Sequence, residues 1–312
     1  MNKVNATLFA LLFILLSSYL LFPTIFEQHD PHEHPWSCGF DHYKRDVFDK
    51  NAAFRLRQAE LEAEWRRYQL GSIDIVPRAS YTIPVVVHVV HQNGLENISD
   101  TRIEESIRLL NDAFANRGYY DPSEGVDVDV EFCLARRDPN NISTTGITRW
   151  ESSLSGVVYE DDAPLKSLVN WPSDCYVNIW VVGEIESISS GAGVAGYATF
   201  PGAHGSTTDG IVIEARWLGT DEGSYSILVH ELGHFLGLYH TFEGGCKNDD
   251  CLVDGDGICD TPPDNSQVGC GQNTCHSDTL SNYSNGIFMT DVPDMTSNFM
   301  DYSSSPNEFT QG

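Results

Sequence analysis

Residues 230–242 read HELGHFLGLYHTF, and this stretch decides the fold. Three apolar residues precede it and no proline interrupts it, so it predicts a helix with Ser224 as its N-cap. Residues four apart on a helix share a face, so the imidazoles of His230 and His234 can meet one metal ion. Zinc suits them best, because it binds neutral imidazole nitrogens and a catalytic site keeps three protein ligands.

The third zinc ligand is expected to be His240, which a continuing helix would place on the wrong side. Gly237 lacks a Cβ, so it can end the helix in a left-handed conformation and bring His240 beneath the metal. Glu231 lies beside the first ligand and is expected to face the attacking water. Zinc lowers the pKa of that water and polarises the substrate carbonyl, while Glu231 accepts the proton and passes it to the leaving amine. The predicted reaction is hydrolysis of an amide bond.

The spacing of these residues resembles the HExxHxxGxxH pattern of the metzincin metallopeptidases, which also carry a methionine turn further along the chain. Thr-Phe after His240 and the later stretch NFMDY, residues 298–302, narrow the resemblance to the pappalysin family, from about Ile83 to the end. The resemblance implies an α+β fold with a twisted mixed sheet, an active-site helix and an irregular C-terminal subdomain. It also implies that substrate pairs with an edge strand above the zinc.

Two further roles follow from the resemblance. Met300 is expected to pack beneath the zinc as the methionine of the turn, without binding the metal. Tyr302 occupies the position from which some metzincins present a phenol to the cleft, where it would hydrogen-bond the oxyanion. The alternative for Tyr302 is packing against the helix.

The N-terminus predicts export. Residues 6–22 are an apolar run behind a single lysine, so residues 1–22 are interpreted as a signal peptide, with an uncleaved type II membrane anchor as the alternative. In both cases the catalytic part lies outside the cell. Eight cysteines and the three sequons of the exported part, at Asn97, Asn141 and Asn282, agree with this route.

Residues 23–78 are interpreted as a propeptide and residues 79–312 as the catalytic domain. The propeptide contains one expected amphipathic helix that ends at Gly71. Its apolar residues are Phe54, Leu61, Trp65 and Tyr68. Candidate processing sites are Arg66-Arg67 and Arg78.

Cys38, followed by Gly39, resembles the cysteine switch of metzincin zymogens. A thiolate there would fill the fourth position of zinc and keep the enzyme latent. The alternative is an ordinary disulfide, and the pairing of eight cysteines cannot be deduced from the sequence. Cys133 and Cys175 lie in or beside expected strands and could form a bridge. A disulfide in the loop after residue 244 is in doubt.

Hard oxygen ligands on glycine-rich backbone follow the zinc motif and suit calcium. The candidates are Asp254, Asp256, Asp260 and Thr261. A solvated acidic loop is the alternative. The formal charge of −27 argues against nucleic acid and anionic membrane surfaces as partners, which leaves protein or peptide substrates.

Strands are expected at residues 81–91, 126–134, 176–182 and 209–214, with a helix from residue 99 or 100 to 114. His88 and His91 are expected to pack in or beside the first strand. Residues 187–196, rich in serine and glycine, are expected to form a surface loop. Together the patterns predict a secreted zinc metalloendopeptidase, made as a latent zymogen. The alternatives are a different metzincin subgroup and a non-enzymatic binding protein derived from one, the latter supported only by a C-terminus that looks truncated.

Overall fold

A computed structural model describes residues 38–72, 80–118, 120, 124–158, 161–186, 193–219, 222–265, 273–276, 278, 288, 290–303 and 306–311. The expected signal peptide, the processing site Arg78 and the sequon at Asn282 lie outside these residues. Within the described part, no helix is both long enough and apolar enough to cross a membrane.

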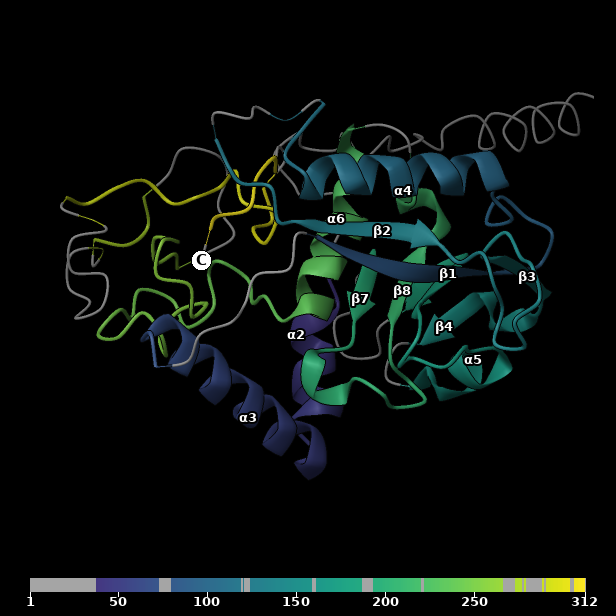
Figure 1. Ribbon diagram of the computed structural model, residues 1–312, viewed down its shortest axis with the longest axis horizontal. Coiled ribbons are helices and arrows are strands. Elements are labelled where there is room, and N and C mark those ends of the chain that lie inside the picture. Colours follow the sequence, from purple (N-terminus) through teal and green to yellow (C-terminus); the bar gives the residue numbers. More distant parts are fainter. Residues whose placement is uncertain are drawn as a thin grey trace, which may run out of the picture. The chain divides into compact units, whose positions relative to one another are not determined.

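The centre of the fold is a six-stranded sheet built around β1 (Tyr81–His91) (Figure 1). Strand order along the sheet is β2-β1-β5-β8-β7, and β3 pairs with the second half of β1. The strands that pair with β1 are β2 (Val130–Leu134), β3 (Ile147–Glu151) and β5 (Val177–Val182). Beyond β5 lie β8 (Ile211–Glu214) and then β7 (Gly196–Ala198). All pairings are parallel except β7 with β8, so β7 is an antiparallel edge strand. The mixed sheet and its helices confirm the expected α+β fold.

Two long helices cover one face of this sheet (Figure 1). They are α4 (Asp100–Phe114) and α6 (Glu222–Leu236), and alternate valines and isoleucines of β1, β5 and β8 pack against them in one apolar cluster. Ser99 caps α4 by accepting a hydrogen bond from the amide of Arg102 at 3.2 Å, as the sequence predicts. The second half of β1 is buried on both faces of the sheet, and therefore its sequence is an almost unbroken apolar run.

The other face of the sheet is covered by chain that precedes it in the sequence. Helix α2 (Phe40–Tyr43) and the π-helical turn Lys44–Phe48 insert three aromatic side chains that are 3% exposed or less. These side chains join residues of α5 (Ala163–Leu168) and the outward residues of β5, β7 and β8 in a second apolar cluster. The expected propeptide is therefore part of the folded core.

Helix α3 (Ala52–Gln69) confirms the expected helix, and the residue that follows its cap, Gly71, has a φ of 63°. Its contact with the rest of the molecule is more polar than the sequence predicted, because Gln58 is the residue that it buries. Gln58 accepts a hydrogen bond from the amide of Gly202 at 2.9 Å. Leu61 and Trp65 remain 39% and 38% exposed and face a cavity of about 630 Å³.

The remaining elements are short. A separate two-stranded sheet pairs β4 (Gly156–Val158) with β6 (Glu184–Glu186), and single 3-10 turns span Ser153–Ser155, Pro201–Ala203 and Ala215–Trp217. After α6, the described chain has turns, loops and an isolated bridge between Asn298 and Glu308, as expected for an irregular C-terminal subdomain.

The cysteine expectations are partly wrong. Cys246 pairs with Cys275 and Cys251 pairs with Cys259, so the loop after residue 244 does contain disulfides. Cys133 and Cys175 do not form the bridge that their positions suggested. Neighbouring strand assignments alone could not show that their side chains are apart, because disulfide geometry requires close and correctly directed Cβ atoms.

Candidate active site

Helix α6 begins at Glu222, two residues before the predicted cap at Ser224, and it ends as predicted at Gly237. Gly237 has a φ of 109°, in the region that favours glycine. Its amide donates to the carbonyl of His234 at 2.9 Å, and the amide of Leu238 donates to the carbonyl of Gly233 at 2.9 Å. This pair of hydrogen bonds is a Schellman motif, and it turns the chain back so that His240 reaches the helix.

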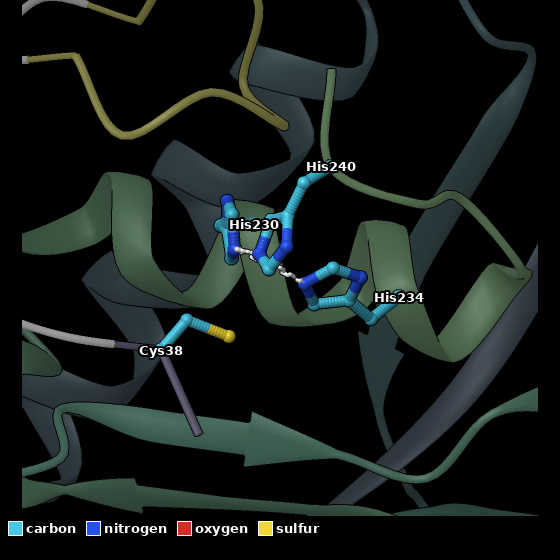
Figure 2. Close-up of side chains that lie close together, drawn as sticks. All are labelled: Cys38, His230, His234 and His240. Atoms are coloured by element: carbon cyan, nitrogen blue, oxygen red, sulfur yellow. Dashed lines mark hydrogen bonds between the residues drawn. The ribbon is translucent and has the colours of Figure 1, made fainter. Parts of the chain in front are cut away.

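The three histidines of the motif meet at one point (Figure 2). The Nε2 atom of His234 lies 3.1 Å from Nε2 of His230 and 3.1 Å from Nε2 of His240, and the third Nε2–Nε2 distance is 3.3 Å. Two nitrogens on a tetrahedral zinc ion, with bonds of about 2.0–2.1 Å, are separated by roughly 3.3–3.4 Å. The three side chains are 1% exposed or less.

The partners of the Nδ1 atoms, which are the nitrogens that point away from the cluster, determine which ring nitrogen carries the proton. Nδ1 of His230 lies 2.7 Å from the carbonyl oxygen of Phe299, and Nδ1 of His234 lies 2.8 Å from that of Leu238. A carbonyl only accepts, so both Nδ1 atoms must donate, which leaves both Nε2 atoms with lone pairs. Burial, with a smaller contribution from His240, lowers the pKa of His230 to about 3, so the ring stays neutral. Converging lone pairs without a proton between them require a cation, and this donor set fits zinc.

Glu231 lies on the same helix and is completely buried. Burial raises the pKa of its carboxyl to about 8. On the edge strand β7, a Cβ added to Gly196 would lie 3.1 Å from Cγ of Glu231, so the backbone of the edge strand and the carboxyl are in close contact. The geometry brings the predicted base, the predicted ligands and a sheet edge together in one place.

Met300 lies under the helix, as the methionine-turn prediction requires. Its Sδ atom is 2.3 Å from the position that a Cβ on Gly233 would take, so only a glycine fits there. The amide of Met300 donates to Oδ1 of Asn298 at 2.8 Å, and the preceding carbonyl, that of Phe299, is the acceptor for His230. The turn therefore supports a ligand through its backbone as well as the helix through its side chain.

Cys38 comes to the histidines from the N-terminal segment. Figure 2 shows its thiol turned toward the three rings, and its Sγ and the histidine nitrogens all lie within 4.8 Å of one another. Across the described part of the chain, this is the one group of three or more histidines, cysteines or carboxylates that close together. Without a bound metal, burial is the largest effect that raises the pKa of the Cys38 thiol well above its usual value, and the Glu231 carboxylate is the next.

The residues around Cys38 bind the edge strand. The amide of Gly39 donates to the carbonyl of Gly196 at 2.9 Å, and Cys38 forms an isolated parallel bridge with the same residue. A Cβ on Gly39 would lie 2.9 Å from Val194. Val194 is buried, and Gly196 belongs to β7, so the expected surface loop at residues 187–196 is wrong for its last part. Residues 187–192 lie outside the described residues.

Tyr302 is 6% exposed and lies beside the metal ligands. Its ring centroid is 4.9 Å from that of His240 and 5.7 Å from that of His230. Its hydroxyl donates to the carbonyl of Cys38 at 3.4 Å. The phenol thus reaches the carbonyl of Cys38 and also packs on two of the histidine rings, so the two expectations for this residue do not exclude each other.

Two residues that the sequence analysis missed, Phe40 and Asp41, lie two and three positions after Cys38. The ring of Phe40 stacks on that of His234, with centroids 3.8 Å apart and planes 10° apart. The carboxylate of Asp41 lies 3.2 Å from Nδ1 of His240. Burial opposes ionisation of Asp41, but the contact with His240 and the charge of Lys44 lower its pKa overall. No spacing rule identifies either residue, because the contacts join positions about 200 residues apart.

The calcium candidates do not lie as close together as the three histidines and Cys38 do. Asp254 accepts from Lys247 at 2.5 Å and from the amides of residues 249 and 250. Asp260 accepts from the amide of Gln311 at 3.1 Å. Asp256 accepts from the amide of Ile258 at 2.9 Å, and burial raises its pKa to about 8 despite hydrogen bonds that include one from Thr261.

Known proteins resemble this chain in sequence. A family model described as pregnancy-associated plasma protein-A matches residues 163–312. An extracellular metalloprotease of Verticillium alfalfae is 30% identical over 263 residues, which cover 78% of this chain and 76% of that protein. An extracellular metalloprotease of Pyricularia oryzae is 28% identical over 290 residues, covering 88% and 84%.

Solved structures resemble it as well. Mature mirolysin of Tannerella forsythia, in complex with a cleaved peptide, is 31% identical, with a TM-score of 0.58 and coverage of 75% of this chain and 89% of that one. A promirolysin mutant from the same organism is 28% identical, with a TM-score of 0.62 and coverage of 88% and 89%. Fold, histidine cluster and relatives together define a metzincin zinc metalloendopeptidase. Among the metzincins, the chain belongs to the pappalysin family, so neither a different subgroup nor a non-enzymatic descendant is supported.

Proposed function

We propose that the chain is an exported zinc endopeptidase, made latent, in which His230, His234 and His240 hold the zinc and Glu231 is the general base. One observation carries this proposal: the Nε2 atoms of three histidines converge within 3.3 Å of one another, beside the buried carboxyl of Glu231. Peptidase relatives support peptide substrates, since mature mirolysin was solved with a cleaved peptide.

The residues of this chain supply positioning and proton transfer. The edge strand β7 offers the carbonyl of Gly196 to an extended peptide, which places the scissile bond at the histidines. Zinc, when bound, supplies Lewis-acid activation of water and of the peptide carbonyl. Glu231 accepts the proton of the attacking water and donates it to the leaving amide nitrogen. Tyr302 donates a hydrogen bond from its hydroxyl to the oxyanion.

Latency rests on residues 23–78, which we propose as the propeptide of a catalytic domain at residues 79–312. Cys38 occupies the side of the three histidines that faces the cleft, and Gly39 uses the edge-strand carbonyl that a substrate needs. A cysteine beside a divalent metal is a thiolate, so a bound metal reverses the raised pKa of the buried thiol. The promirolysin structure covers 88% of this chain and the mature form 75%, in agreement with a propeptide.

Export is the second part of the proposal. Residues 1–22 act as a signal peptide, or as a type II anchor that leaves the catalytic domain outside. The relatives from both fungi are named extracellular metalloproteases. Of the three sequons, Asn97 and Asn141 are exposed and so accessible to glycosylation.

A structural calcium ion is the third part of the proposal, with Asp256, Asp260 and Thr261 as ligands. The supporting observation is the raised pKa of Asp256, a half-buried carboxyl next to Asp260, a second carboxylate, because a divalent cation would stabilise both charges. Asp254 is the weakest of the predicted ligands, because Lys247 already neutralises it. Calcium is expected to raise the unfolding temperature of the protein, and Asp256→Asn is expected to abolish that increase.

The experiment that tests the catalytic proposal compares cleavage of a mixed peptide library before and after limited trypsin treatment, which can cut at Arg66 or Arg67 in the last turn of α3. We expect activity to appear after trypsin treatment and dilution, and to disappear with a zinc chelator and in Glu231→Gln. The control is Glu104→Gln, an exposed carboxylate on α4. Full activity of Glu231→Gln, or activity that survives complete removal of zinc, would contradict the proposed mechanism.

A further inference from the structure

The outer nitrogens of the three zinc ligands have different kinds of partner. His230 donates from Nδ1 to the carbonyl of Phe299, and His234 donates from Nδ1 to the carbonyl of Leu238. Both acceptors are backbone atoms of the catalytic domain, so they remain in place after any processing of the N-terminal segment.

His240 differs from the other two. Its Nδ1 atom lies 3.2 Å from Oδ1 of Asp41, which belongs to α2 in the proposed propeptide. The ring itself is fully buried, whereas the Asp41 side chain is 44% exposed at the rim. Phe40, the neighbour of Asp41, packs beside the same ring, with ring planes 85° apart and a centroid distance of 5.9 Å to His240.

A carboxylate that accepts the outer N–H of a ligating histidine fixes its tautomer, orients its ring and raises its basicity. Removing such a partner typically weakens metal binding by about 10- to 100-fold. We propose that Asp41 is a positioning residue for His240, so that the propeptide retains zinc in the zymogen as well as blocking the cleft. The mature enzyme, which lacks Asp41, then binds zinc more weakly than the zymogen does. This inference rests on the proposed zinc ligation by His240.

The test must separate Asp41 from the thiol of Cys38, which approaches the same metal site. We therefore take the full zymogen carrying Cys38→Ala, which removes the thiol, together with Glu231→Ala, which prevents self-cleavage. Into this parent are placed Asp41→Ala, Asp41→Asn and, as the control, Asp46→Ala. Asp46 lies on the same segment and pairs with Arg45 and Lys50, away from the histidines.

The zinc dissociation constant of each protein is measured by competition with a chromophoric chelator. Asp41→Ala is expected to raise the constant by about 10- to 100-fold over the parent. Asp41→Asn, which keeps an acceptor oxygen near Nδ1 of His240 without a charge, is expected to lie between the two. The rate of trypsin cleavage in α3 reports whether the propeptide stays docked, and it is expected to be unchanged in Asp41→Asn.

Two results overturn the inference. One is a zinc constant for Asp41→Ala within about twofold of that for the Asp46→Ala control. The other is a normal constant for Asp41→Asn combined with weak binding and fast trypsin cleavage for Asp41→Ala, which would assign Asp41 a role in packing only. A parent that fails to bind one zinc ion per chain would instead refute the proposed function, so the two failures are distinguishable.

Discussion

Phe40→Ala is the change that most directly measures how tightly the propeptide holds the enzyme latent. The Phe40 ring is 0% exposed, stacks on the ring of His234 and contacts Phe200 with centroids 5.1 Å apart. It lies two residues after Cys38, so its packing determines whether the thiol stays at the histidines. Because it belongs to the propeptide, its loss affects the zymogen and leaves the sequence of the processed enzyme unchanged.

The magnitude follows from the burial. Replacing a fully buried phenylalanine by alanine costs about 3–5 kcal/mol. Each 1.4 kcal/mol is about a factor of ten in an equilibrium constant, so the docked state of the proposed propeptide should weaken by roughly 10²- to 4 × 10³-fold. While the docked state still dominates, the open fraction and the activity of the uncut zymogen rise by the same factor.

The assay is the rate at which uncut zymogen cleaves a quenched fluorescent peptide, with Leu56→Ala as the control. Leu56 lies on α3 and is 68% exposed, so its truncation should leave latency unchanged. After processing and removal of the propeptide, Phe40→Ala should give the kcat/KM of the unmodified enzyme, which excludes misfolding as the cause. A folded Phe40→Ala zymogen that is no more active than Leu56→Ala would refute the packing argument.

Three further changes test other contacts. Gly39→Ala, whose Cβ would lie 2.9 Å from Val194, should increase the activity of the uncut zymogen without affecting the processed enzyme. Gly233→Ala, which would place a Cβ 2.3 Å from Sδ of Met300, should lower stability by about 1–3 kcal/mol in urea unfolding, and an unchanged midpoint would argue against a tight turn. Burial first, and then neighbouring carboxylates, raise the pKa of Asp301 to about 7. The folded state therefore binds this proton more strongly than the unfolded state, so stability present below about pH 4 is lost as the pH rises toward 7. Asp301→Asn should reduce the fall in Tm between about pH 5 and about pH 8, and an equal fall in both proteins would assign it to other groups.

The local parts of the site could be predicted from the sequence. Positions 230 and 234 share a helical face by geometry, and a glycine seven residues after the first histidine ends the helix without any distant contact. The strand at residues 81–91 was equally clear, because a run of β-branched residues that is buried on both faces has no other common structure. These predictions depend on residues close together in the chain.

The contacts across the chain could not be predicted in this way. Strand β7 has only three residues, Gly196–Ala198, and it forms because it can pair with the edge of β8. The segment before it is rich in glycine and serine, so its composition resembles that of a loop. Asp41 and Phe40 gain their roles from histidines about 200 positions later. Cys38 was assigned by resemblance alone, and the disulfide pairs depend on loop geometry that composition does not determine.

The proposed propeptide and a bound substrate would compete for the same atoms. The carbonyl of Gly196, the hydroxyl of Tyr302 and the open side of the histidines all contact Cys38 or Gly39 in this structure. The proposed latency would therefore need no distortion of the catalytic domain, only occupancy of these atoms by the N-terminal segment. A cut in α3 at Arg66 or Arg67 severs the chain but leaves the buried residues before it docked, because their contacts do not depend on the bond that is cut. Activation must then end with dissociation or further digestion of that segment, and the aromatic packing that sets latency also limits how fast activity appears.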